Sequence, residues 1–140
     1  MNEPVEKEIN GHIYSFRKLD TFTQFHVVRK LSPAFMLFAD LADKNANFNE
    51  LDIEAIMPIM EFISTMKEED VNYLLKVCLN VVARKNPQSG DLQKILAGGN
   101  LQLMFQDIDL STMIQLTVQV IMGSVGNFYN SPLGSTSQAG

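Results

Sequence analysis

The sequence has only one cysteine, Cys78, so no disulfide can form within a single chain. Its neighbours, Val77 and Leu79, are apolar, which indicates a small buried side chain rather than an activated thiolate. A cysteine of this kind suits a reducing compartment, and we expect the protein in the cytoplasm.

Long apolar runs are also absent. No stretch approaches the ~18 consecutive apolar residues that a membrane-spanning helix requires. The N-terminal residues lack the basic and apolar regions of a signal peptide. We therefore expect a protein that neither enters a membrane nor is exported.

Basic residues are too few and too scattered for a nucleic-acid interface. The chain has 11 Lys and Arg against 16 Asp and Glu, which gives a formal net charge of -5. Its small basic clusters are pairs, such as Arg17-Lys18, Arg29-Lys30 and Arg84-Lys85. Because polyanions are bound through clustered cations, the sequence argues against nucleic acid as a partner.

Groups that could carry out catalysis are missing as well. His12 lies just past a predicted turn, and His26 lies in a predicted helix with no acidic partner at ligand spacing. Gly98-Gly99 lacks the strand, further glycines and lysine of a phosphate-binding loop. No nucleophile, base and orienting group can be assembled, so we expect neither an enzyme nor a cofactor.

What the sequence does have is enough apolar residues for one packed core. It is 140 residues long, with 46% hydrophobic and 19% charged residues, which is typical of a single globular domain. Residues 130–140 are rich in Ser and Gly and have almost no apolar side chains to bury. We predict one domain over residues 1–129 and a flexible tail over residues 130–140.

The local patterns predict a mainly α fold that begins with a β-hairpin. Residues 5–9 and 12–16 are two short β-forming runs separated by Asn10-Gly11, the pair that best forms a type I′ turn. Apolar residues at helical spacing then predict a compact bundle of about five helices, near residues 21–31, 33–42, 53–66, 68–85 and 110–128. Predicted helix starts are marked by the capping residues Thr21, Thr65 and Asp109.

Methionine and exposed phenylalanine are the strongest candidates for contacts with another protein. The chain has 8 methionines, and the predicted helix near residues 53–66 is apolar almost all round. Such a helix is either central to the core or presents a second face to a partner. We select as candidate protein-binding residues Phe22, Phe25, Met57, Met60 and Phe62, and for each the alternative is an ordinary core position.

Residues 43–54 resemble a calcium-binding EF-hand loop in part. Asp43 and Glu54 occupy the first and twelfth positions, but Phe48 replaces the glycine that normally makes the sharp turn. Glu50 also occupies a position that is usually hydrophobic. A weak calcium site therefore competes with an Asn-rich loop whose Asn49 caps the next helix.

Two segments resemble the tail assembly chaperones of tailed bacteriophages and prophages. One comprises residues 10–14, NGHIY, and residues 17–33, RKLDTFTQFHVVRKLSP. The other comprises residues 104–110, MFQDIDL, and the later residues 127–129, NFY. The resemblance implies a small, mostly helical protein in the host cytoplasm that binds the aggregation-prone tape measure protein. It also implies help in recruiting tail tube subunits.

Two other classes of function remain open at this point. One is a helical adaptor or regulator of unrelated origin, and the other is a weak calcium-binding helical module. The same apolar stripes would also allow self-association.

Overall fold

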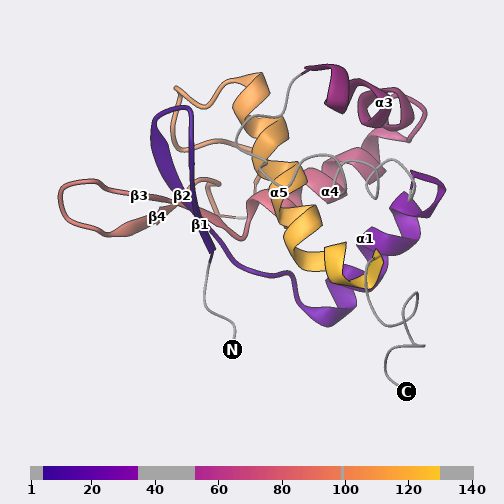
Figure 1. Ribbon diagram of the computed structural model, residues 1–140, viewed down its shortest axis with the longest axis horizontal. Coiled ribbons are helices and arrows are strands. Elements are labelled where there is room, and N and C mark those ends of the chain that lie inside the picture. The colour runs from indigo at the N-terminus through magenta and orange to yellow at the C-terminus, as the bar shows by residue number, and fades with distance from the viewer. Residues whose placement is uncertain (1–4, 35–52, 99, 130–140) are drawn as a thin grey trace.

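The structure is a computed structural model that describes residues 5–34, 53–98 and 100–129. A β-sheet forms one side of the molecule and helices form the other (Figure 1). The helices within these residues are α1 (Thr21–Leu31), α3 (Ile53–Ile63), α4 (Glu68–Leu79), α5 (Leu110–Tyr129) and the short 3-10 helix η1 (Ser32–Ala34).

The sheet corrects the predicted fold class. Its strands are β1 (Val5–Ile9), β2 (His12–Phe16), β3 (Val82–Lys85) and β4 (Leu92–Lys94), arranged in the order β1-β2-β3-β4. Every neighbouring pair is antiparallel. The prediction of a mainly α bundle of about five helices is therefore wrong, and the fold combines a four-stranded sheet with helices.

The error arose where α4 gives way to β3. We predicted that the helix continues to Lys85, but α4 ends at Leu79 and the chain turns at Asn80. The next residues pair with β2, in a register that places Val82 opposite Phe16. Val82 is buried in this strand, and an apolar residue at this position fits the buried face of a helix equally well, so its apolar character could not distinguish a helix from a strand.

A turn after Lys85 joins β3 to β4 as a second hairpin. The Asn86 side-chain oxygen accepts hydrogen bonds from the backbone N–H groups of Gln88 and Ser89, at 2.8 and 3.1 Å. Gly90 has a φ of 80°, a conformation that glycine adopts without strain. This loop therefore returns the chain alongside β3.

The N-terminal hairpin is confirmed, and it belongs to the core. Asn10 and Gly11 both have positive φ angles, 52° and 85°, as a type I′ turn requires. Tyr14 and Phe16 on β2 are only 1% and 6% exposed. The hairpin is thus an integral edge of the sheet, and its turn is held to α5 by a hydrogen bond from the Asn10 amide to the Thr112 hydroxyl.

The helix caps agree with the sequence in part. Asp109 caps α5 as predicted, and its carboxylate accepts a hydrogen bond from the Thr112 backbone N–H at 2.9 Å. The cap of α1 is Asp20 rather than Thr21. The predicted capping box at Thr65 does not form, because its hydroxyl donates to the Phe62 carbonyl.

Helix α5 is the centre of the fold and lies between the sheet and the other helices (Figure 1). Leu116 and Val120 on this helix are 0% and 1% exposed. Cys78 on α4 is also fully buried, which confirms its interpretation as a small core residue. No helix within the described residues is long and apolar enough to span a membrane.

Three sequence predictions lie outside the described residues. These are most of the helix predicted near residues 33–42, nearly all of the EF-hand-like segment at residues 43–54, and the flexible tail at residues 130–140.

Candidate protein-binding site

An apolar pocket of about 120 Å³ lies where α3, α4 and α5 meet beside the last residue of α1. Each helix contributes side chains to its wall. The lining residues are Leu31, Ile59, Met60, Ile63, Val71, Leu74, Leu75, Leu110, Met113, Ile114, Thr117, Val118 and Ile121.

The pocket offers a ligand almost no polar group. Thr117 is its single hydroxyl-bearing residue, and that hydroxyl already donates to the Met113 carbonyl at 2.9 Å. None of the lining side chains ionises. The site therefore suits apolar side chains and contains no acid, base or nucleophile for catalysis.

The rim of the pocket is open to solvent. Leu110 at the start of α5 is 67% exposed, although it also lines the pocket. Met60 and Met113 are half-buried on two different helices. Unbranched methionine side chains adapt to varied shapes, so this rim can accommodate more than one apolar sequence.

The structure brings only part of the predicted residue set to this pocket. Met60 lines it, and Met57 lies one helical turn earlier on α3 with 46% of its surface exposed. Phe62 is half-buried and packs against the core. Phe22 and Phe25 are on α1, 81% and 60% exposed, and neither lines the pocket.

Comparison with known families gives this site its context. A family model described as phage tail assembly chaperone protein, TAC, matches residues 10–135, which is most of the chain. The chain belongs to this family. No curated protein and no solved structure matched it.

Family membership confirms the resemblance found in the sequence and the general role of a phage tail assembly chaperone. A chaperone role is not an enzymatic one, and a pocket lined by apolar side chains suits it. Membership also implies that the chain binds phage tail proteins.

The chaperone's α5 supplies pocket residues that are not among the five selected candidates. Leu110 and Met113 belong to the apolar stripe that predicted this helix. Spacing alone shows that such residues share one face, but it does not show whether another element covers that face. Leu110 directly follows the cap residue Asp109, and a large apolar residue at a helix start is the one signal that was available.

A second cluster holds the loop before α5 against the sheet. Arg84 on β3 donates to both carboxylate oxygens of Asp107, at 2.7 and 3.0 Å, and lies 4.3 Å from the centre of the Phe105 ring. His12 on β2 is 3.3 Å from the same carboxylate. The Arg84 guanidinium lowers the pKa of Asp107, whereas burial raises the pKa of Tyr14 beside them. We call the ion pair between Arg84 and Asp107 the Arg84–Asp107 clasp, and its role is structural.

The described part of the chain contains no group of three or more His, Cys, Asp or Glu side chains that could hold a metal ion. The EF-hand-like segment is not included in that statement, because residues 35–52 lie outside the described residues. Calcium binding there stays a sequence prediction.

Proposed function

We propose that this chaperone binds apolar helical segments of the tape measure protein, keeps that protein soluble in the host cytoplasm, and helps to recruit tail tube subunits. The observation that carries the proposal is the open apolar pocket between α3, α4 and α5, with its rim at Leu110 and Met60.

An apolar helix is the kind of ligand that this pocket fits. A helix lays side chains spaced three and four residues apart into a groove between other helices. Each aliphatic side chain that is fully buried there contributes about 1.5–3 kcal/mol. The flexible Met57 and Met60 side chains on α3 allow the rim to follow segments of different sequence.

The charge of the chain supports the same role. Its net charge of -5 keeps a complex with an apolar partner away from neutrality, where association and precipitation are promoted. The pocket itself contains no ionisable side chain, so a segment that binds in the pocket does not have to desolvate a charged lining residue.

Among the predicted contact residues, we assign Met57 and Met60 to the pocket rim. Phe62 contributes mainly by supporting α3, because it packs against the core. Phe22 and Phe25 form a separate exposed surface on α1.

The test is co-expression with the tape measure protein of the same phage, with soluble and aggregated fractions measured. Leu110→Asp places a charge at the rim with little cost to folding, because Leu110 is 67% exposed and acidic residues are favourable in a first helical turn. We expect this variant to lose most of the solubilisation while its melting temperature is retained.

Leu92→Asp is the matched control, because Leu92 is 49% exposed on β4 and does not line the pocket. It should keep the tape measure protein soluble. Full solubilisation by Leu110→Asp would overturn the assignment of the pocket. Failure of the unmodified chain to solubilise or co-purify with the tape measure protein would overturn the proposed function itself.

Recruitment of tail tube subunits requires a separate measurement. Purified tail tube protein should be retained by the immobilised complex of chaperone and tape measure protein. No retention by either the complex or the chaperone alone would remove this part of the proposal.

A further inference from the structure

The apolar pocket between α3, α4 and α5 is closed at its base. Leu31, Ile59 and Leu74, which come from α1, α3 and α4, line the pocket and are each no more than 4% exposed. Val118 on α5 also lines it and is 3% exposed. We call these four side chains the pocket base. Because the base is buried and Leu110 at the rim is exposed, a ligand enters from the rim and ends at the base.

The pocket has room for one large side chain. Its volume is about 120 Å³. For comparison, an engineered protein cavity of about 150 Å³ that is lined by Leu, Ile and Phe stays dry and holds benzene. One leucine or phenylalanine side chain fits such a volume, whereas two do not. A helix that binds here therefore inserts a single anchor residue, and its neighbouring side chains lie on the rim.

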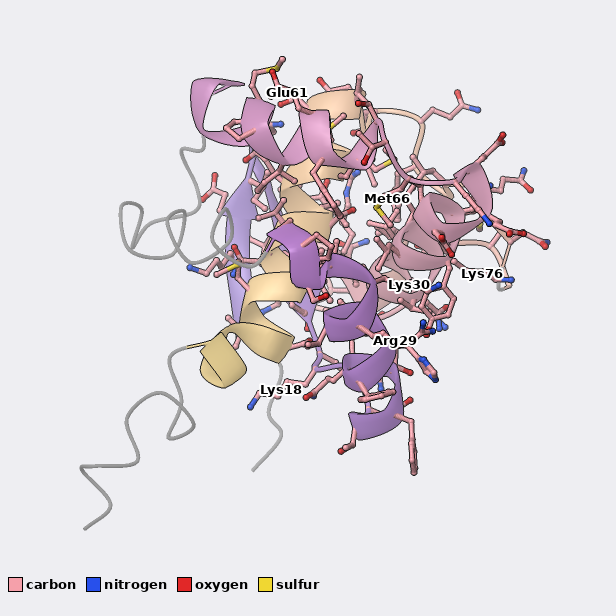
Figure 2. The ribbon with its side chains drawn as sticks, turned by 90° about the vertical axis from the view of Figure 1, so that its right-hand side faces the viewer. Lys18, Arg29, Lys30, Glu61, Met66 and Lys76 are labelled. Atoms are coloured by element: carbon pink, nitrogen blue, oxygen red, sulfur yellow. The ribbon has the colours of Figure 1, made fainter. Side chains whose placement is uncertain are left out.

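The pocket base offers no hydrogen-bonding partner to a polar atom. All four of its side chains are hydrocarbons, and no nitrogen or oxygen atom of the lining is exposed inside the pocket. Figure 2 shows the exposed Glu61 of α3 and Lys76 of α4 at the periphery of these helices, and neither lines the pocket. A hydroxyl, amide or charged group at the tip of an inserted side chain would lose its water at the base without gaining a hydrogen bond.

We propose that the pocket recognises a single anchor residue of the tape measure helix, and that the tip of this residue is a hydrocarbon group, as in leucine or phenylalanine. Tyrosine, glutamine and lysine are rejected as the anchor, because their polar tips would reach the pocket base. The half-buried Met60 and Met113 at the rim contact the residues on either side of the anchor. This specificity rests on the function proposed above and names the feature of the partner that the pocket selects.

Toluene and phenol test the chemistry of the pocket without any partner protein. The two molecules have nearly the same shape, and a hydroxyl in phenol replaces the methyl group of toluene. We expect toluene to bind the chain about tenfold tighter or more than phenol, because the phenol hydroxyl would be buried without a hydrogen bond. In NMR titrations with toluene, the methyl signals of Ile59, Leu74 and Val118 should shift.

Filling the pocket tests whether the tape measure protein uses the same space. Val71 is half-buried on α4 and lines the pocket, so Val71→Phe should abolish toluene binding and most of the solubilisation of the tape measure protein. Val77→Phe is the matched control, because Val77 is half-buried on the same helix and does not line the pocket. Met60→Phe is a second blocking variant on α3, for use if Val71→Phe lowers the melting temperature.

The anchor residue is identified on the partner side. Limited proteolysis of the complex with the tape measure protein should leave one protected segment, and each apolar residue of that segment is then replaced by Gln in turn. One replacement should weaken binding by about tenfold or more and the others far less, as expected for a single buried anchor. Leu or Phe at that position should bind well, whereas Tyr should bind about tenfold more weakly or worse.

Equal affinity for toluene and phenol, or no toluene binding, would overturn the proposed specificity. So would several segment positions of equal weight, or a tyrosine anchor that binds as well as phenylalanine. Normal solubilisation by a folded Val71→Phe variant that no longer binds toluene would overturn the anchor and leave the chaperone function standing. Selective toluene binding without any complex with the tape measure protein would overturn the proposed function instead. Self-association that toluene or Phe22→Gln abolishes would assign the pocket to a second copy and overturn the anchor.

Discussion

Cys78 has no exposed surface, and burial raises the pKa of its thiol to about 12. The thiolate is the reactive form of cysteine, so the folded chaperone holds this residue in an inert state. Thr117 is also buried, and its hydroxyl donates a hydrogen bond to the Met113 carbonyl. At single positions, the environment removes chemistry that the residue type would permit.

This state of Cys78 predicts slow labelling. At about pH 8, near the pKa of a free thiol, a thiol reagent should modify unfolded protein within minutes and leave the folded chaperone unmodified over the same period. The reaction should be followed by mass spectrometry in buffer and in guanidinium chloride. Fast labelling without denaturant would contradict the buried position of Cys78.

Helices α1 and α5 each begin after an aspartate that forms a local hydrogen bond. Asp20 and Asp109 each accept a backbone N–H, from Thr23 and Thr112 respectively, and these hydrogen bonds hold the pKa of each carboxyl below its usual value. A carboxyl whose pKa is lowered by folding stabilises the folded state at pH values above its unfolded pKa. That stability is lost as the pH falls through the folded pKa.

The caps therefore predict acid sensitivity. The melting temperature should fall as the pH drops below about 4, the usual pKa of an aspartate in an unfolded chain. Asp20→Asn with Asp109→Asn should melt near the unmodified temperature at neutral pH, because Asn caps helices as well as Asp does. Between neutral pH and about pH 3 the double variant should lose less stability than the unmodified chain.

Asp91→Asn is the control for this experiment, because the Asp91 side chain makes no hydrogen bond among the described residues. It should leave the dependence on pH unchanged. An equal acid-induced fall in the melting temperature of the double variant and the unmodified chain would show that the two caps do not carry the effect.

At the scale of the whole molecule, the sheet and the helices share one core. Tyr14 from β2, Val82 from β3 and Leu116 from α5 are each no more than 1% exposed and belong to a single cluster of buried residues. The Arg84–Asp107 clasp adds a contact between β3 and the loop that leads into α5. The N-terminal hairpin is therefore expected to unfold together with the helices.

Truncating the hairpin side chain that faces the core tests this expectation. Tyr14→Ala should destabilise the whole chain by about 3–5 kcal/mol, the range for removing a large buried aromatic side chain. Its neighbour Ile13, which is 39% exposed, provides the control, and Ile13→Ala should cost far less. The readout is the helical circular dichroism signal during thermal unfolding, and an unchanged helical transition in Tyr14→Ala would show that the hairpin folds separately.

Sequence alone determined the features that depend on neighbouring residues. The Asn10-Gly11 turn, the Asp109 cap and the buried character of Cys78 each follow from a few adjacent positions, and the structure confirms them. The family was also recognisable from short segments, and the match over residues 10–135 confirms it. Local backbone preference and local hydrogen bonding suffice for such features.

Tertiary structure alone decided the features that depend on distant partners. Val82 lies in a strand because β2 provides an edge for pairing, although its sequence pattern also fits a helix. Phe62 packs against the core while Phe22 faces solvent, although the sequence leaves a contact position and a core position open for both. Pairing and burial are set by which elements come together, and one residue's neighbours in the chain do not contain that information.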